Sequence, residues 1–399
     1  MDRARIITNE LRIFKETPVV VSMADPMEKT WGYHRIPTVS RMPDGGILLT
    51  YVNNLDSNLC YGHAGPSFMS YDEGRSWQIV DLDEKGLAIS DSPVTKVYEG
   101  EYICVPMPVG ITSKELPEEF IRNPAGKIHI YRWLYQYRLE DAPKNIQDYF
   151  RYIRCIRWKP DREEWIEEKI DWDIQRSILK VEGEDYTGMS GQIVHTSFEN
   201  PPVRYNGEII QADYKNTRMR EDGSIPKNTV CCMVSKDNGH SFKFRSFIAA
   251  FDEGQDDLQP NESDLVETLD GRLLCVSRNY THKMPMLLFY SDDAGYTWSQ
   301  PAMLFDMGAF PQTLLLKNGI LVLSYGRPGD YISFSPDGSG ITWTEPVTLV
   351  KSDEIDCGYS RLLELSENTF LAAYTDFDHL DARGRKRKAI ITQRITVER

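Results

Sequence analysis

An eight-residue motif recurs four times along the chain, and this repetition constrains the fold more than any other feature. The motif reads S-x-D-x-G-x-[ST]-[WF], with a longer fourth copy, and occupies residues 70–77, 235–242, 291–298 and 335–343. Its aspartate can accept backbone N–H bonds within a turn, its glycine can take a positive φ, and its aromatic side chain can pack underneath. Because every copy lies between strand-like runs, the motif predicts a recurring hairpin turn. We expect its aspartates to be structural rather than catalytic.

A second repeat, a tight turn between two apolar runs, alternates with the first. Its turns lie at residues 43–46, 270–271, 317–319 and 366–368. Asp-Gly and Asn-Gly between β-rich runs favour hairpins. Together the two repeats give units of four strands with an inner and an outer hairpin, which is the pattern of a propeller blade.

The repeats predict an all-β fold, a six-bladed β-propeller of four-stranded antiparallel blades that forms a single domain over residues 1–399. The blades are expected at residues 35–82, 90–175, 190–250, 260–308, 309–350 and 357–399. The second blade has no clean repeat copy, and we assign to it the strand-like runs 127–139, 150–158 and 164–172. Residues 6–14 are expected to pair with the last blade and so remove an exposed edge. Residues 117–121 and 144–149 are expected to form at most short turns.

Composition excludes several classes of function. The net charge of −14 argues against a nucleic-acid surface, which needs a concentrated basic face. No apolar run has the length of about 20 residues that a membrane span requires, and no signal peptide is visible at the N-terminus. The seven scattered cysteines favour reduced thiols in a cytoplasmic protein, and no spacing indicates a metal or another cofactor. The oligomeric state stays open.

Five residues lie at matching positions around the expected inner hairpins. Arg35 precedes the first inner strand, whereas Arg278 and Arg327 end the corresponding second strands of the fourth and fifth blades. Glu262 opens the fourth blade and Tyr359 opens the sixth. Functional residues of propellers lie at strand ends and loops on one face, so we expect these side chains to converge.

At this point the chain resembles the exo-α-sialidase (neuraminidase) family over essentially its whole length. The repeated motif is similar to the Asp-box of that family, and Arg35-Ile36-Pro37 is similar to its R-I-P motif. The resemblance implies a sialidase-like glycoside hydrolase that releases a terminal sialic acid or a related 2-keto sugar acid from a glycan. It implies that Arg35, Arg278 and Arg327 bind the sugar carboxylate. It also implies that Tyr359 is the nucleophile and Glu262 its partner base.

The chemistry of these residue types fits such a substrate. Guanidinium groups are permanently charged, fork-like donors for a carboxylate. Because the reacting carbon of a 2-keto sugar acid bears that carboxylate, an anionic nucleophile would be repelled, whereas a neutral tyrosine would not. Tyrosine nucleophiles are a known exception among glycoside hydrolases.

The resemblance also implies a general acid. The family places an aspartate in the loop after the second strand of the first blade, and Asp56 is the candidate in that loop. Asn53-Asn54 replaces the arginine commonly seen at the end of that strand, and the loop continues to His63, which is an alternative acid or substrate contact.

Two other functions remain open. One is an enzyme on uronate-containing polysaccharide, such as a lyase that uses His63 and a tyrosine. The other is a propeller that binds a sugar acid without catalysis. Asp264 competes with Glu262 because strand alternation sends both to the same side. Aromatic residues between 131 and 172 are expected to be mostly core, with one or two beside the cleft.

Overall fold

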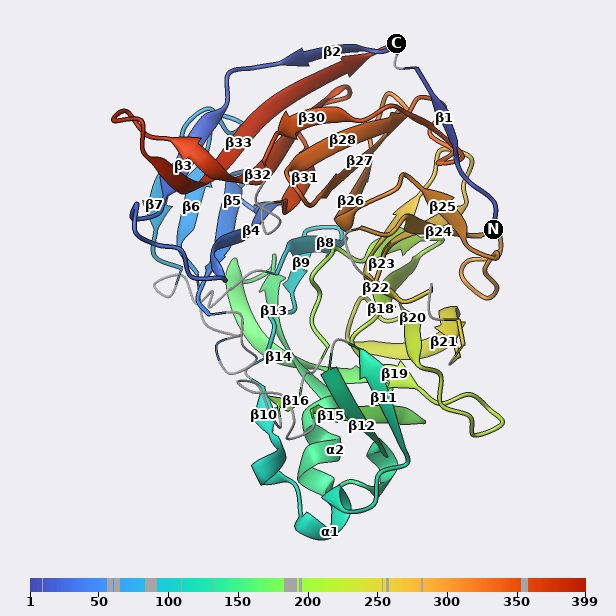
Figure 1. The fold of residues 1–399 in the computed structure, drawn as a ribbon. Helices are drawn as coiled ribbons and strands as arrows, with labels where there is room; N and C mark the ends of the chain where they lie inside the picture. The colour runs from blue at the N-terminus through green and yellow to red at the C-terminus, as the bar shows by residue number, and fades with distance from the viewer. Residues whose placement is uncertain are drawn as a thin grey trace.

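The computed structural model describes the 399 residues apart from 9, 56–59, 61–64, 83–91, 109, 131, 183–191, 194–195, 253, 256–257, 281–282 and 353–357. Within this part the chain is almost entirely β-strand, with short α-helices at α1 (Glu118–Ile121) and α2 (Lys144–Arg151). The sheets follow one another around a ring (Figure 1). No helix in the described ranges is long and apolar enough to cross a membrane.

Four sheets contain an antiparallel meander of four strands. The first consists of β4 (Tyr33–Arg41), β5 (Ile47–Asn53), β6 (Ser67–Ser70) and β7 (Gln78–Val80). Another consists of β22 (Pro260–Glu267), β23 (Leu273–Asn279), β24 (Met286–Ser291) and β25 (Ala302–Leu304). The next contains β26 (Ala309–Leu315), β27 (Leu321–Gly326), β28 (Asp330–Ser335) and β30 (Val347–Val350). The last combines β31 (Ser360–Glu364), β32 (Thr369–Leu380) and β33 (Lys386–Glu398) with the N-terminal strands β2 (Arg12–Lys15) and β3 (Val19–Met23).

A larger sheet of eight strands lies between the first sheet and the sheet that begins at β22. One half contains β8 (Val94–Tyr98), β9 (Glu101–Cys104), β13 (Tyr152–Lys159) and β14 (Glu164–Trp172). The other half contains β17 (Val203–Tyr205), β18 (Glu208–Asp213), β20 (Asn228–Ser235) and β21 (Ser241–Phe251). A short parallel pairing of β14 with β21 joins the halves. Each half has the strand order of the other meanders.

The hydrophobic core is divided among the interfaces between neighbouring sheets. Leu265 and Leu273 pack with Val230 of the preceding sheet in one cluster. Leu49 of the first sheet packs with Leu371 of the last sheet in another, so the ends of the ring are joined by apolar contact. Burial of one face of each sheet against the next is what holds the ring together.

The predicted pairing of the N-terminal segment with the last sheet is found for only part of the segment. β2 pairs antiparallel with β33 of the last sheet, which confirms the prediction for residues 12–14. β1 (Arg5–Ile7) instead pairs in parallel with β29 (Thr342–Thr344), beside the preceding sheet. The segment therefore crosses from one sheet to the next and covers an edge on each.

A small lobe departs from the prediction. Its main sheet contains β11 (Gly126–Ile130), β12 (Arg132–Arg138), β15 (Ser177–Glu182) and β19 (Thr217–Arg218), and β10 (Ile111–Thr112) pairs with β16 (Gln192–Ile193). The assignment of residues 127–139 to the second blade is wrong, because β12 pairs with β11 and β15 and not with β13. Alternating hydrophobicity identifies a strand, but it does not show which other strand pairs with it.

The lobe has an apolar core of its own. Tyr137 and Leu179 of its sheet pack there against Ile146 and Phe150 of α2. The expectation of at most a short turn at residues 144–149 is wrong, since α2 runs for eight residues. Ile146 and Phe150 are four residues apart and face the same side of the helix, so tertiary burial stabilises a segment whose helical pattern is short. The single-domain organisation stays a prediction.

In all four octet turns the serine Oγ donates to the aspartate and accepts the glycine N–H, which confirms the hairpin prediction. In the second copy, Ser235 Oγ donates to Asp237 Oδ1 at 2.7 Å and accepts the Gly239 N–H at 2.8 Å. Asp237 also accepts the N–H and hydroxyl of Ser241. Burial raises the pKa of Asp237, but these hydrogen bonds outweigh it and leave the pKa below its ordinary value.

Candidate functional site

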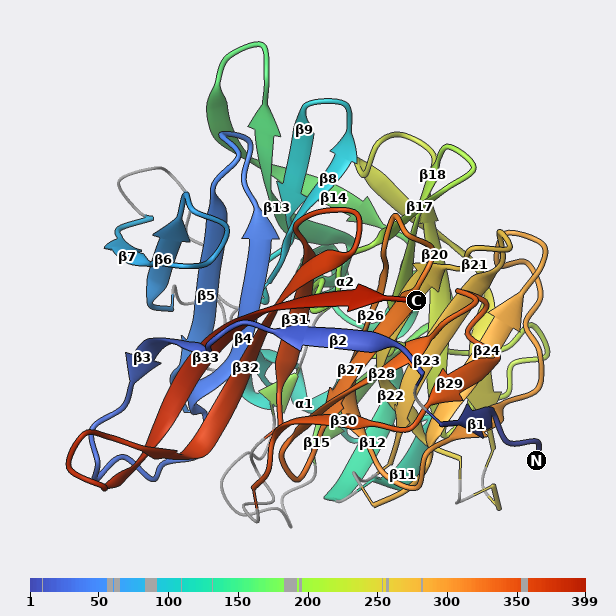
Figure 2. The ribbon, with the colours of Figure 1, turned by 90° about the horizontal axis from the view of Figure 1, so that it is seen from above.

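The five residues singled out in the sequence lie at one end of the ring. In an antiparallel meander, the first strand begins at the end of the sheet where the second strand finishes. Arg35 and Glu262 lie near the starts of β4 and β22, and Tyr359 directly precedes β31. Arg278 is near the end of β23, and Arg327 directly follows β27. The β4–β5 and β8–β9 turns lie at the opposite end (Figure 2).

The lobe arises from connections at this same end of the ring. They are the segments 105–151 after β9, 173–202 before β17, and 214–227 after β18. Figure 2 shows β11 and β12 on the side away from the β4–β5 and β8–β9 turns. The octet turns link third to fourth strands and hence lie at the far end. The candidate site and the lobe therefore share one face.

Arg35 and Arg327 surround the same two aromatic rings. Their Cζ atoms lie 5.3 Å and 4.6 Å from the centre of the Tyr359 ring. They also lie 4.1 Å and 5.0 Å from the centre of the Trp31 ring. Such distances are those of cation–π contacts, which hold the two guanidinium groups in place.

Arg278 joins this group through Glu262. Its Nη1 donates to Glu262 Oε1 at 2.8 Å, and the Phe310 N–H donates to Glu262 Oε2 at 2.9 Å. Burial raises the pKa of Glu262, but the charges of Arg278 and Arg327 and these hydrogen bonds prevail, so the pKa lies below its ordinary value. Glu262 is consequently an ionised carboxylate at neutral pH and interacts electrostatically with Arg278 and Arg327.

Tyr359 occupies the centre of the cluster. The Phe310 ring lies 5.1 Å from its ring in an edge-on arrangement, and Trp31 lies 6.4 Å away. Among the described residues, no hydrogen bond joins Glu262 to the Tyr359 hydroxyl. The carboxylate is instead held by Arg278 and the backbone of Phe310.

A buried polar layer lies one strand step deeper. Arg361 is 1% exposed, and its Nη atoms donate to Asn200 Oδ1 at 2.7 Å, to Gln312 Oε1, and to the Glu199 carbonyl at 2.6 Å. These partners belong to the segment before β17 and to β26, so Arg361 of β31 links three parts of the ring beneath Tyr359.

Asp264 belongs to this deeper layer and not to the arginine cluster. Its Oδ2 accepts the Thr313 N–H and hydroxyl, both at 2.6 Å. Burial raises the pKa of Asp264 to about 6, against the lowering effect of Thr313 and Arg361. Glu262 and Asp264 thus share a strand face but differ in surroundings, and only Glu262 contacts one of the three arginines.

The cluster is tightly covered. Tyr359 is 4% exposed, Arg35 3% and Arg327 9%. Trp31, in the turn before β4, lies against both arginines. Sequence reasoning missed Trp31 and Phe310, because neither belongs to a repeated motif, although Trp31 lies only four residues before Arg35 and next to Gly32.

Two predicted residues, Asp56 and His63, lie outside the described residues. Their position relative to the arginines stays a prediction. In the described ranges, no group of three or more His, Cys, Asp or Glu side chains is arranged to hold a metal ion.

The fold is a ring of β-sheets, and several solved structures have a similar fold. A protein of unknown function from Dyadobacter fermentans aligns with a TM-score of 0.65 at 15% identity, covering 97% of this chain and 99% of that one. The intramolecular trans-sialidase of Ruminococcus gnavus aligns with a TM-score of 0.50 at 13% identity, covering 91% and 94%. The α-L-arabinanase of Penicillium chrysogenum aligns with a TM-score of 0.52 at 12% identity, covering 95% and 98%.

These identities are low, so the likeness concerns the fold alone. The sequence matches no protein-family profile. It also matches no curated protein sequence. The function therefore has to be argued from the side chains of the site.

Proposed function

We propose that this chain is a retaining exo-glycosidase of the sialidase type. Its substrate is a glycan that ends in sialic acid or a related 2-keto sugar acid. The observation that carries this proposal is the convergence of Arg35, Arg278 and Arg327 around Tyr359 and Glu262 from four separate sheets. In an acidic protein, such a local concentration of guanidinium groups favours an anionic ligand.

The proposed reaction has two steps. The Tyr359 oxygen attacks the anomeric carbon as Glu262 takes the phenol proton, and the bond to the leaving sugar breaks. An acid in the first-sheet loop, Asp56 or His63, gives the leaving oxygen its proton. Water then attacks the anomeric carbon and gives a proton to the deprotonated acid, Asp56 or His63. The bond to Tyr359 breaks, and Glu262 returns its proton to the phenolate.

Two structural features bear on this proposal. Glu262 has to release part of its contact with Arg278 to reach the phenol, and Trp31 has to move from the two guanidinium groups that would bind the carboxylate.

The proposal also includes six blades, with the eight-stranded sheet counted as two. Each of its halves has the strand order of a blade.

The central test replaces Tyr359 by phenylalanine and measures the release of phenol from an aryl α-sialoside. We expect turnover to fall by at least about a thousandfold, while a dehydrated sialic acid analogue still binds. The control is Tyr71→Phe, since Tyr71 is 67% exposed at the opposite end of the ring. Equal turnover of Tyr359→Phe and the unaltered protein would refute the nucleophile assignment.

A substrate panel separates the proposal from its alternatives. Hydrolysis of an aryl α-L-arabinofuranoside with no action on the sialoside would contradict the substrate class. Unsaturated product from a uronate polysaccharide would identify a lyase. Binding of the analogue without turnover of any glycoside would identify a binding protein.

A further inference from the structure

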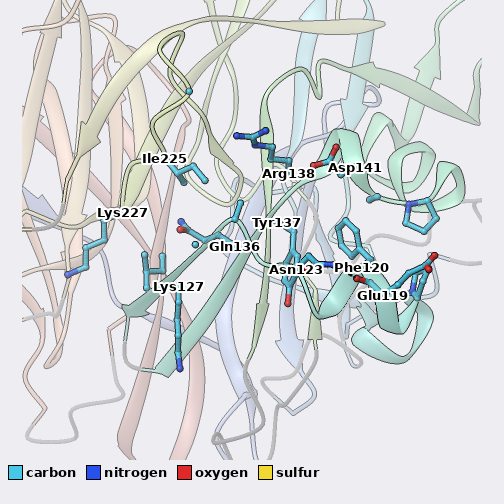
Figure 3. Close-up of a pocket in the computed structure, with 17 residues that line it drawn as sticks. Glu119, Phe120, Asn123, Lys127, Gln136, Tyr137, Arg138, Asp141, Ile225 and Lys227 are labelled. Atoms are coloured by element: carbon cyan, nitrogen blue, oxygen red, sulfur yellow. Dashed lines mark hydrogen bonds between the residues drawn. The ribbon is translucent and has the colours of Figure 1, made fainter.

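The lobe contains a large cavity that is separate from the residues of the arginine cluster. Its volume is about 1170 Å³, which is ample for several sugar rings. It is lined by α1, by β11 and β12, and by the connection that includes residues 223–227. Figure 3 shows its walls, with Phe120 on one side and Ile225 on the other.

Strand alternation sends neighbouring side chains of β12 to opposite faces of the lobe sheet. Tyr137 borders the cavity but packs in the apolar core of the lobe, where it is 2% exposed. Its neighbours Gln136 and Arg138 both line the cavity. In Figure 3 the Gln136 amide and the Arg138 guanidinium extend in the same direction, toward the segment that carries Ile225.

Gln136 carries a buried donor that is not used. The residue is 3% exposed, and its Nε2 has no hydrogen-bond partner within the part of the chain that the structure describes. Gly126 is its partner across the β11–β12 pair, and a Cβ at Gly126 would lie 2.7 Å from Gln136 Oε1. The glycine thus leaves space beside an amide whose burial without a partner is costly.

The charge of the cavity differs from that of the whole chain. The chain has a net charge of −14, yet the cavity is lined by three cationic residues, Lys127, Arg138 and Lys227, against Glu119 and Asp141. Lys127 Nζ lies 4.3 Å from the centre of the Trp133 ring and 4.9 Å from that of Tyr135, so its ammonium points away from Gln136 and Arg138 (Figure 3), and Arg138 is the cation nearest to Gln136 along β12. Local charge of this kind attracts an anionic ligand into an otherwise acidic protein.

From these features we infer that the lobe cavity is a second binding site, for an acidic oligosaccharide. Arg138 donates to a carboxylate oxygen, Gln136 donates to a hydroxyl after a shift of its buried amide toward the cavity, and Phe120 offers an apolar surface to a sugar ring. The identity of the ligand rests on the proposed function, because the cavity belongs to a lobe built on the same face as the arginine cluster. The site would hold the part of an anionic glycan that is remote from the bond to be cleaved.

The test measures binding of a tetramer of α-linked sialic acid by titration calorimetry. The Tyr359→Phe protein is used so that the probe is not cleaved. We expect Gln136→Leu and Arg138→Met, each added to this background, to weaken binding by about fivefold to tenfold, the loss of one hydrogen bond to a charged group. Arg138 is exposed, so its substitution leaves folding intact even where Gln136→Leu does not.

The matched control is Lys144→Met. It removes a cation from the same lobe, but Lys144 lies on α2 and pairs with Asp148 at 2.7 Å. The Lys144→Met variant should bind the tetramer with the same affinity as the Tyr359→Phe protein. With Tyr359 intact, Arg138→Met and Lys144→Met should hydrolyse a small aryl sialoside at the unaltered rate.

The outcomes separate the two proposals. Equal tetramer affinity in all variants, or no binding at millimolar concentration, would overturn the lobe site whatever the turnover. Weakened binding in both cavity variants supports the lobe site, even if no aryl sialoside is hydrolysed. In that last case the proposed hydrolase activity fails, whereas the binding site stands.

Discussion

The guanidinium carbon of Arg35 lies 4.1 Å from the centre of the Trp31 ring, and the Arg327 carbon lies 5.0 Å from the same centre. The indole therefore occupies the surface that two carboxylate-binding arginines would present. We expect a ligand carboxylate to form paired hydrogen bonds with both groups once the ring shifts. Trp31 is therefore predicted to act as a cover over the arginine cluster.

Replacing Trp31 by alanine should expose this cluster. We expect the association rate of a dehydrated sialic acid analogue to rise by about tenfold, since binding no longer waits for the ring to move. Stopped-flow fluorescence measures this rate. The protein should also lose stability, because two cation–π contacts and a large apolar contact area are removed.

A useful comparison for Trp31→Ala is Trp133→Ala, which removes an indole that is 42% exposed on the lobe. Its association rate for the monomeric analogue should stay unchanged. If Trp31→Ala binds the analogue no faster than the unaltered protein, the covering role is wrong.

Arg327 should not be replaceable by lysine. Lysine keeps the charge but loses the planar fork that matches a carboxylate and stacks on the Tyr359 ring. We expect KM for an aryl sialoside to rise by about tenfold or more, which corresponds to about 1.4 kcal/mol. Steady-state kinetics measure the change.

The control for Arg327→Lys is Arg245→Lys. Arg245 also stacks on an aromatic ring, with its Cζ 4.4 Å from the centre of Tyr296, and it pairs with Glu208 at 2.6 Å. It belongs to β21, away from the arginine cluster. An equal rise in KM for both substitutions would attribute the effect to general loss of stability and not to carboxylate binding.

The ring and much of its site could be predicted because they depend on local turns and on residues placed at strand ends. Each octet supplies its own hydrogen bonds, so the turn is encoded where it occurs. Once the turns fix the strand order, Arg35 and Arg327 must converge although they are far apart in sequence. The position of Tyr359 follows for the same reason.

The lobe could not be predicted in this way. β12 has the alternation of a blade strand, yet it pairs with β15, which follows it by about 40 residues. The position of Trp31 over the arginines could not be predicted either, because a single tryptophan in a turn belongs to no repeated pattern. Both features depend on long-range packing, which strand periodicity does not specify.

Stability should depend on pH through Asp264. Burial raises its pKa in the folded protein to about 6, above the unfolded value near 3.8. The folded state therefore binds the proton more tightly, and the contribution of Asp264 to stability is lost as the pH rises through 6. The shift corresponds to about 3 kcal/mol between low and neutral pH.

We expect Asp264→Asn to remove this dependence. Relative to the unaltered protein, the variant should gain up to about 3 kcal/mol of unfolding free energy between pH 4 and pH 7.5. Denaturant unfolding at several pH values measures the difference. Asp292→Asn, at a side chain that is 83% exposed, should show no such trend. Parallel stability curves for Asp264→Asn and the unaltered protein would contradict the assignment.

Among the substitutions considered, loss of Arg361 should lower the free energy of unfolding the most. Replacing it by leucine removes the donor to Gln312 Oε1 and to the Glu199 carbonyl at the centre of the ring, and leaves Asn200 Oδ1 with Gln312 Nε2 as its donor. We expect a loss of about 3–5 kcal/mol in the free energy of unfolding, measured by denaturant titration. The matched substitution is Arg12→Leu, which breaks an exposed ion pair with Glu398 and should cost less than about 1 kcal/mol. If the two variants lose similar stability, Arg361 does not tie the inner strands together, because a central link and a surface pair cannot have the same effect.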